Sequence, residues 1–271
     1  MSSVYKFLDY ELYDPLTPEG RSRISFLSSV LLNILKEEVA REWEGKERVE
    51  VLDVCCGKGI GAAAAVEAIR QLGFEPRVTI VDSRREAVEF AESFLKNELG
   101  VEVSPYVMSA EEVVSLRKAF DLALMAGFSS IHFDPWRMVK LIASISASLA
   151  RHGVFILEEV DRLYRYLTKG VKEISIARVT RGKILLAIHE PGDYDPIRSL
   201  IKFTILDAIT GDSEELYLHP WSVGELAALL WIFFRDIKIV NEDGISYILG
   251  KGPREEIKAI DIATETPPIE D

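Results

Sequence analysis

The segment from Val49 to Gly61 constrains the fold more than any other part of the chain. It reads Val-Glu-Val-Leu-Asp-Val-Cys-Cys-Gly-Lys-Gly-Ile-Gly, and four alanines follow directly. An apolar strand therefore ends in a turn of glycines that opens into a helix. Because glycine lacks a Cβ atom, such a turn lets a nucleotide-like ligand approach the backbone. Asp53 lies inside the apolar run, where a carboxylate is costly to bury unless something pairs with it. These features predict a site for a nucleoside cofactor.

Apolar strands and amphipathic helices alternate from residue 49 onward, which is typical of a parallel α/β sheet. We expect strands at 49–55, 77–82, 102–107, 120–126, 153–158, 236–240 and 245–249. We expect helices at 18–43, 59–72, 84–98, 110–117, 134–151 and 222–234. A short link joins the last two strands, so they should pair antiparallel. The predicted fold class is α/β: a Rossmann-like, mostly parallel seven-stranded sheet with helices on both faces, an antiparallel last strand and a β-rich insertion.

The same reading divides the chain into five parts, since the alternation begins after residue 45 and changes after residue 159. They are an N-terminal aromatic segment with a lid helix (1–45), a cofactor-binding core (46–170), a β-rich insertion (171–218), a C-terminal helix and strand pair that complete the core (219–251), and a flexible acidic tail (252–271). Thr17 and Pro18 provide the cap and the first residue of the lid helix.

Composition narrows the possible partners and location. The net charge of −12 argues against a nucleic-acid backbone as the main partner, because phosphate binding needs a basic face. No apolar run approaches the ~20 residues that span a bilayer, so we expect no membrane insertion. The two cysteines, Cys55 and Cys56, are adjacent and predict neither a disulfide framework nor a metal site, which favours the cytoplasm. Scarce amides and abundant Glu, Lys, Arg and Ile are typical of a thermophile.

Residues 52–59 resemble the first motif of class I S-adenosylmethionine-dependent methyltransferases, in which an acidic residue and a G-x-G turn hold the cofactor. The Asp-Val-Cys-Cys-Gly form is similar to that of quinone-ring C-methyltransferases, where cysteine often replaces the first glycine. The resemblance implies that Asp53, Cys55, Gly57 and Gly59 bind S-adenosylmethionine. The turn also fits the spacing G-x-G-x-x-A of a dinucleotide site, so an NAD-dependent oxidoreductase is an alternative.

The second strand ends in Asp82, followed by Ser83. A carboxylate at this point can accept hydrogen bonds from both hydroxyls of a ribose, and the family holds the adenosine ribose here. The structural alternative is that Asp82 caps the next helix.

Ser109, Ala110 and Glu111 stand where the family contacts the adenine amino group. The same residues also fit a helix capping box between Ser109 and Glu112. The sequence does not decide between the adenine contact and the capping box. Ala126 ends a fourth-strand motif that resembles those of small-molecule members of the family.

Methyl transfer from a sulfonium needs an acceptor aligned with the S–CH₃ bond, and positioning can supply most of the rate. Some acceptors also need a general base, for which His132 is the best-placed histidine, a structural role being the alternative. Tyr10, Tyr13 and Arg21 are candidates for a lid over cofactor and substrate, unless the tyrosines simply pack on the sheet edge.

The resemblance implies an enzyme that transfers a methyl group from S-adenosylmethionine to a small-molecule acceptor and releases S-adenosylhomocysteine. Alternatives are an RNA or protein methyltransferase on the same scaffold, and a non-catalytic S-adenosylmethionine-binding module. The insertion at 171–218 would shape the acceptor pocket or a dimer contact, so a homodimer stays open.

Overall fold

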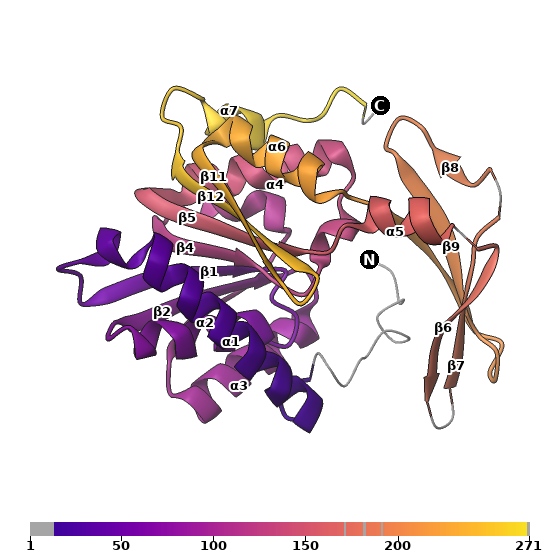
Figure 1. Cartoon of the computed structure of the whole chain (residues 1–271), viewed down its shortest axis with the longest axis horizontal. Coiled ribbons are helices and arrows are strands. Elements are labelled where there is room, and N and C mark those ends of the chain that lie inside the picture. Colours follow the sequence, from indigo (N-terminus) through magenta and orange to yellow (C-terminus); the bar gives the residue numbers. More distant parts are fainter. Residues whose placement is uncertain (1–13, 171, 181–182, 191, 270–271) are drawn as a thin grey trace.

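The structure, a computed structural model, describes residues 14–170, 172–180, 183–190 and 192–269 of the chain. A central sheet with helices on both faces forms the larger part, and a second, smaller sheet stands beside it (Figure 1).

The central sheet has seven strands in the order β3-β2-β1-β4-β5-β12-β11. Their bounds are β1 (Arg48–Val54), β2 (Glu75–Asp82), β3 (Glu102–Val107), β4 (Phe120–Met125), β5 (Leu149–Glu159), β11 (Phe234–Glu242) and β12 (Ile245–Pro253). The pairs β2–β3, β1–β2, β1–β4 and β4–β5 are parallel, whereas β12 is antiparallel to both neighbours. This arrangement confirms the predicted fold class, including the antiparallel last strand. The carboxyl ends of β1, β2, β4 and β5 share one edge, where doubly wound sheets bind ligands.

Helices cover both faces because the strands bury alternate side chains on each. On β1, Val49 and Val51 pack into one apolar core and Leu52 and Val54 into the other. The first face is covered by α1 (Pro18–Glu38), α2 (Ile60–Gln71) and α3 (Arg85–Leu99). The second is covered by η4 (Ala110–Leu116), α4 (Pro135–Ser148), α6 (Val223–Phe233) and α7 (Ala259–Thr264).

The predicted cap of α1 is confirmed, since the Thr17 hydroxyl accepts a hydrogen bond from the Gly20 N–H (3.0 Å) and Pro18 is the first helical residue. The helix ends earlier than expected, at Glu38, and a separate 3₁₀ turn, η3 (Ala40–Trp43), continues the chain. Trp43 is fully buried there, edge-on to Phe74.

Several boundaries differ from the sequence-based expectation. The helix expected at 110–117 is the 3₁₀ helix η4, and α4 ends at Ser148 because β5 begins at Leu149. Two α-helices were not predicted: α5 (Arg162–Lys169) after β5, and α7 within the segment expected to be a flexible tail. Helix α7 packs through Ala259 and Ala263, whose spacing of four residues is too short a pattern to recognise in the sequence.

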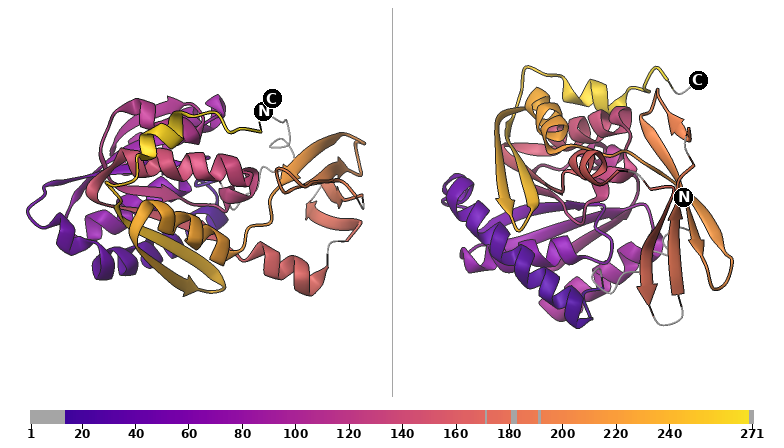
Figure 2. Two further views of the ribbon diagram at one scale, coloured as in Figure 1. Left: turned by 90° about the horizontal axis from the view of Figure 1, so that it is seen from above. Right: turned by 45° about the vertical axis from the view of Figure 1, so that its right-hand side comes forward.

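The β-rich insertion forms a separate antiparallel sheet. It contains β6 (Ile174–Thr180), β7 (Lys183–Ile188), β8 (Tyr194–Asp195), β9 (Leu200–Asp207) and β10 (Ser213–Leu218). The sheet lies beyond the edge formed by the carboxyl ends of the central strands (Figures 1 and 2). It is tied to that edge where His219 N–H donates to the Ile131 carbonyl (3.0 Å) and Trp136 Nε1 donates to the Ile197 carbonyl (3.1 Å). Among the residues described, no helix is long and apolar enough to cross a membrane.

Candidate functional site

The glycine turn between β1 and α2 has the backbone conformation that its sequence suggests. Gly57 and Gly59 have φ of 54° and 91°, in the left-handed region that glycine adopts without strain. Cys55 also has a positive φ, 56°, although it carries a side chain. A Cβ atom at Gly59 would lie 3.2 Å from the Cβ of Ala91 on α3, so this glycine also lets α3 pack closely.

Asp53 is buried beneath the first turn of α2. Its Oδ2 accepts a hydrogen bond from the Ala62 N–H (2.8 Å), which satisfies one of the unpaired donors at the helix start. Gly61 makes this approach possible, because a Cβ there would lie 3.1 Å from both Asp53 oxygens and 3.0 Å from the Ala126 Cβ. Burial raises the pKa of Asp53 to about 8; the Ala62 N–H opposes the rise and the Asp82 charge adds to it. The buried acid thus holds the glycine turn and α2 in register.

Asp82, at the tip of β2, joins the second strand to the glycine turn. Its Oδ2 accepts from the Gly57 N–H (3.0 Å), and its Oδ1 accepts from the Arg84 N–H (3.0 Å) at the start of α3. The Arg84 guanidinium donates through Nε to Oδ1 and through Nη2 to Oδ2, each at 3.0 Å. The structure therefore brings Asp82 to Gly57, and it shows a contact at the start of α3 in keeping with the capping alternative. The Arg84 guanidinium on Asp82 was not predicted.

The predicted adenine end lies at the beginning of η4. The capping-box reading is wrong, because Ser109 makes no side-chain cap: its hydroxyl donates to the Glu111 carboxylate instead. The other Glu111 oxygen accepts from Arg137 Nε on α4 (2.6 Å). Ala110 is buried next to them. Both carboxylate oxygens of Glu111 therefore already accept hydrogen bonds, one from Ser109 and one from Arg137.

Three further candidates lie near the same edge. Ser83 is half-buried directly after Asp82, and Ala126 is buried at the end of β4 against the position of the Gly61 Cβ. His132 ends η5 (Ser129–His132), the short 3₁₀ helix after β4. Burial, together with the positive charges of nearby arginines, lowers the pKa of His132 to about 4, so its imidazole is neutral at pH 7.

The lid candidates are only partly described. Tyr10 and Tyr13 lie outside the described residues, and Arg21 is exposed on α1. The described chain nevertheless begins beside the glycine turn, because Asp14 Oδ2 forms an ion pair with Lys58 Nζ (2.9 Å).

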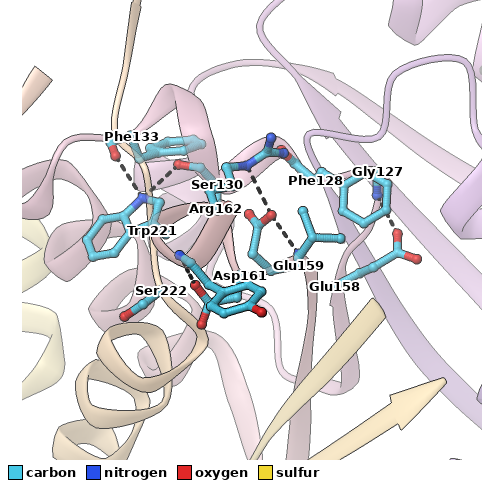
Figure 3. Close-up of polar contacts among 12 residues, drawn as sticks. Gly127, Phe128, Ser130, Phe133, Glu158, Glu159, Asp161, Arg162, Trp221 and Ser222 are labelled. Atoms are coloured by element: carbon cyan, nitrogen blue, oxygen red, sulfur yellow. Dashed lines mark hydrogen bonds and ion pairs between the residues drawn. The ribbon is translucent and has the colours of Figure 1, made fainter. Parts of the chain in front are cut away.

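A buried ionic cluster on Glu158, near the end of β5, escaped the sequence analysis. Its Oε2 accepts from the Gly127 N–H (2.8 Å), as Figure 3 shows, and its Oε1 accepts from Arg23 of α1 and from the Tyr247 hydroxyl (3.1 Å). Burial alone would lower the pKa of Arg23, but the Glu158 charge raises it. The cluster fixes α1 and the loop after β4 to the sheet.

The neighbouring Glu159 points to the opposite face of β5 (Figure 3). Its Oε1 accepts from the Val160 N–H (2.8 Å) and forms an ion pair with Arg162 Nε of α5 (3.1 Å). Its Oε2 has no hydrogen-bond partner among the described residues. Burial raises the pKa of Glu159 to about 7, against the opposing charge of Arg162. Alternation along a strand offered the only sequence signal for either glutamate.

A groove of about 680 Å³ opens between the start of α1, the loop after β4 and the turn joining β11 to β12. Its aromatic walls are Phe26 and Phe128, each within 6 Å of the Arg23 guanidinium. The groove thus combines apolar walls with a paired, buried cation.

Comparison with known proteins identifies the type of domain. Residues 51–153 match the protein family described as "Methyltransferase domain". A search of curated protein sequences finds no match.

Three solved structures have the same fold over most of both chains. The PH0226 protein from Pyrococcus horikoshii is 21% identical, with a TM-score of 0.63 over 94% of this chain and 100% of that one. An S-adenosylmethionine-dependent methyltransferase from Clostridium acetobutylicum is 16% identical, with a TM-score of 0.62 over 93% and 100%. The CcbJ methyltransferase from Streptomyces caelestis is 13% identical, with a TM-score of 0.60 over 93% and 96%. At these identities the likeness shows the fold alone.

Proposed function

We propose that the chain is an S-adenosylmethionine-dependent methyltransferase that methylates a small-molecule acceptor; the match of residues 51–153 to the family described as "Methyltransferase domain" supports this. In this proposal the cofactor is S-adenosylmethionine. The finer parts of the proposal are the residues that hold the cofactor and the class of the acceptor.

The contact between Gly57 N–H and Asp82 Oδ2 carries the assignment of the cofactor site. It brings the glycine turn of β1 and the acidic tip of β2 to one point at the carboxyl edge of the sheet. In our proposal Asp82 holds the ribose, while Gly57 and Gly59 let the cofactor approach the backbone. Asp53 contributes by fixing the start of α2, and Cys55 by its place in the turn.

The remaining predicted contacts complete this assignment. Ser83 would lie beside the ribose, Ser109, Ala110 and Glu111 near the adenine, and Ala126 near the reacting methyl group. The Asp14–Lys58 pair supports a lid formed by the residues that precede α1, including Tyr10 and Tyr13.

Two observations favour a small acceptor. The net charge of −12 opposes the binding of a nucleic-acid backbone. The groove lined by Phe26, Phe128 and Arg23 lies beside the end of β4 and suits a compact, largely apolar molecule. The first class to test is a quinone or related ring, because the motif form resembles quinone-ring C-methyltransferases.

When S-adenosylmethionine is bound, it supplies an electrophilic methyl group, and the residues of the chain orient the acceptor and exclude water. His132 is our candidate for the group that receives a proton from the acceptor. Its neutral imidazole at pH 7 supports that role, although a pKa of about 4 makes it a weak base.

The experiment that tests the cofactor site is calorimetric titration of S-adenosylmethionine and S-adenosylhomocysteine into the wild type and Asp82→Ala. A hydrogen bond to a charged acceptor is worth about 1.5–3 kcal/mol, so the loss of even one should make the variant bind at least roughly 10- to 100-fold more weakly. No binding by the wild type, or equal binding by the variant, would refute the assignment. Circular dichroism of the variant controls for misfolding.

Acceptor class requires a second experiment, transfer of a labelled methyl group to panels of small molecules, RNA and protein. Transfer to RNA that weakens steeply with salt would favour the RNA alternative. Cofactor binding without transfer to any panel would favour a non-catalytic binding module.

Cytoplasmic location and a homodimer through the insertion remain parts of the proposal. The free thiols of Cys55 and Cys56 support the former, and light scattering would test the latter.

A further inference from the structure

We propose that Arg84 competes with the cofactor for Asp82. When S-adenosylmethionine binds, its ribose hydroxyls replace the Arg84 guanidinium as hydrogen-bond donors to the Asp82 carboxylate. This inference rests on the proposed ribose role of Asp82 and concerns a residue that neither the motif nor the family match assigns.

The first support is the number of acceptor positions on Asp82. A carboxylate has about four lone-pair sites, two on each oxygen. Four N–H donors from the described residues fill them: the backbone N–H of Gly57 and Arg84, and Nε and Nη2 of the Arg84 guanidinium. The backbone donors are fixed by the glycine turn and by the start of α3. The two guanidinium bonds are therefore the ones that a ribose diol, with its two hydroxyl donors, would replace.

The second support is the position of the guanidinium over the glycine turn. A Cβ atom placed on Gly57 would lie 3.7 Å from Arg84 Nη2. The arginine therefore occupies space against the turn through which the cofactor approaches the backbone, in addition to holding the Asp82 oxygens.

The third support is that Arg84, and not Asp82, is able to move. The Arg84 side chain is 29% exposed, whereas that of Asp82 is 6% exposed. Arg84 precedes the first residue of α3 and has an extended backbone, so rotation of its side chain leaves the helix intact. The pair of Arg23 with Glu158, by contrast, is buried on both sides and offers no such freedom.

The exchange has a measurable consequence. If the binding-competent form has Arg84 turned away, the apparent Kd exceeds the intrinsic Kd by the inverse of that fraction. A partly exposed ion pair is weak, so we expect a penalty of about two- to five-fold. Arg84→Met keeps the aliphatic stem but removes the donors, and it should bind S-adenosylhomocysteine about two- to five-fold more tightly than the wild type.

Calorimetric titration of S-adenosylhomocysteine tests this in five proteins: wild type, Arg84→Met, Arg85→Met, Asp82→Asn and the double variant Asp82→Asn/Arg84→Met. Arg85 is the matched control, because it is the next residue, is exposed and pairs with Glu89 instead. We expect tighter binding only in Arg84→Met, and no gain from that change in the Asp82→Asn background. The midpoints of urea unfolding check that the variants fold. Arg84→Lys serves as a second variant, in which a less rigid cation replaces the guanidinium.

Wild-type binding with equal or weaker binding by a folded Arg84→Met would overturn the competition while leaving the cofactor site standing. Equal tightening in Arg85→Met would also overturn it, because a general loss of positive charge would then explain the effect. Absence of binding by the wild type would instead refute the proposed site itself.

Discussion

Asp53→Asn should remove part of the pH dependence of the unfolding free energy. In the native protein Asp53 has a pKa of about 8, because burial disfavours its charged form. In the unfolded chain the same group titrates near its ordinary value of about 3.9. A raised native pKa means that the native state keeps a proton which the unfolded chain releases. The stability that Asp53 contributes is therefore complete below about pH 4 and is lost as the pH rises through 8.

The shift fixes the size of the effect. One pKa unit corresponds to about 1.36 kcal/mol, so a rise from 3.8 to about 8 is on the order of 5 kcal/mol over the whole range. Asparagine does not titrate, and its amide oxygen can accept the Ala62 N–H bond that Asp53 Oδ2 makes. Relative to the wild type, the variant should gain about 4 kcal/mol between pH 4.5 and 8.

Urea unfolding at half-unit steps of pH measures the difference in unfolding free energy between the two proteins. Other carboxylates titrate in both and cancel in that difference. Leu52→Ala is the control: Leu52 is the fully buried neighbour on β1, and its truncation should cost about 2–5 kcal/mol equally at every pH. A difference for Asp53→Asn that stays constant with pH would refute the reasoning, since it would mean that Asp53 is charged in the native state throughout.

Further expectations concern local contacts. Gly59→Ala and Gly45→Ala both place a side chain at positive φ (91° and 83°), but only Gly59 has a close neighbour, so Gly59→Ala should cost about 1–2 kcal/mol more in urea unfolding. Equal losses would show that backbone strain alone matters. Tyr247→Phe removes a hydrogen bond to a buried carboxylate and should lower the unfolding free energy by about 1.5–3 kcal/mol, with a negligible change contradicting the cluster's role. Hydrogen bonds from Lys238 and Lys251 lower the pKa of Glu38, so its contribution should be present at pH 7 and lost as the pH falls through the lowered pKa. Glu38→Gln should cost up to about 1 kcal/mol at pH 7 and progressively less in acid in the same assay, and a loss that grows as the pH falls would contradict this sign.

The fold could be predicted from sequence patterns that extend over only a few residues. Apolar runs such as 122–126 need cover on both faces, and the alternation with helices requires parallel strands. The glycines after β1 and the acid at the tip of β2 mark the edge where those strands end, because parallel strands place their carboxyl ends together. Sequence reasoning could therefore predict the sheet, its insertion and the edge at which Gly57 and Asp82 lie, but not the contact between them.

Contacts between residues far apart in the sequence could not be predicted from the sequence. Arg23 and Glu158 are 135 positions apart, and only the packing of α1 on the sheet brings them together. Ser109 and Glu112 have the spacing of a capping box, yet in the structure the Ser109 hydroxyl donates to Glu111. Helix α7 forms because α4 offers a surface that buries its two alanines.

By itself, the sequence determined where the backbone turns, which strands are buried and which residues bring chemistry to the edge of the sheet. Only the tertiary structure decided which charges pair there, including Arg84 on Asp82 and Arg162 on Glu159. The reason is physical: periodicity and glycine placement follow from local backbone geometry. The partner and the pKa of a buried charge depend instead on distance and desolvation, which exist only once the chain has folded.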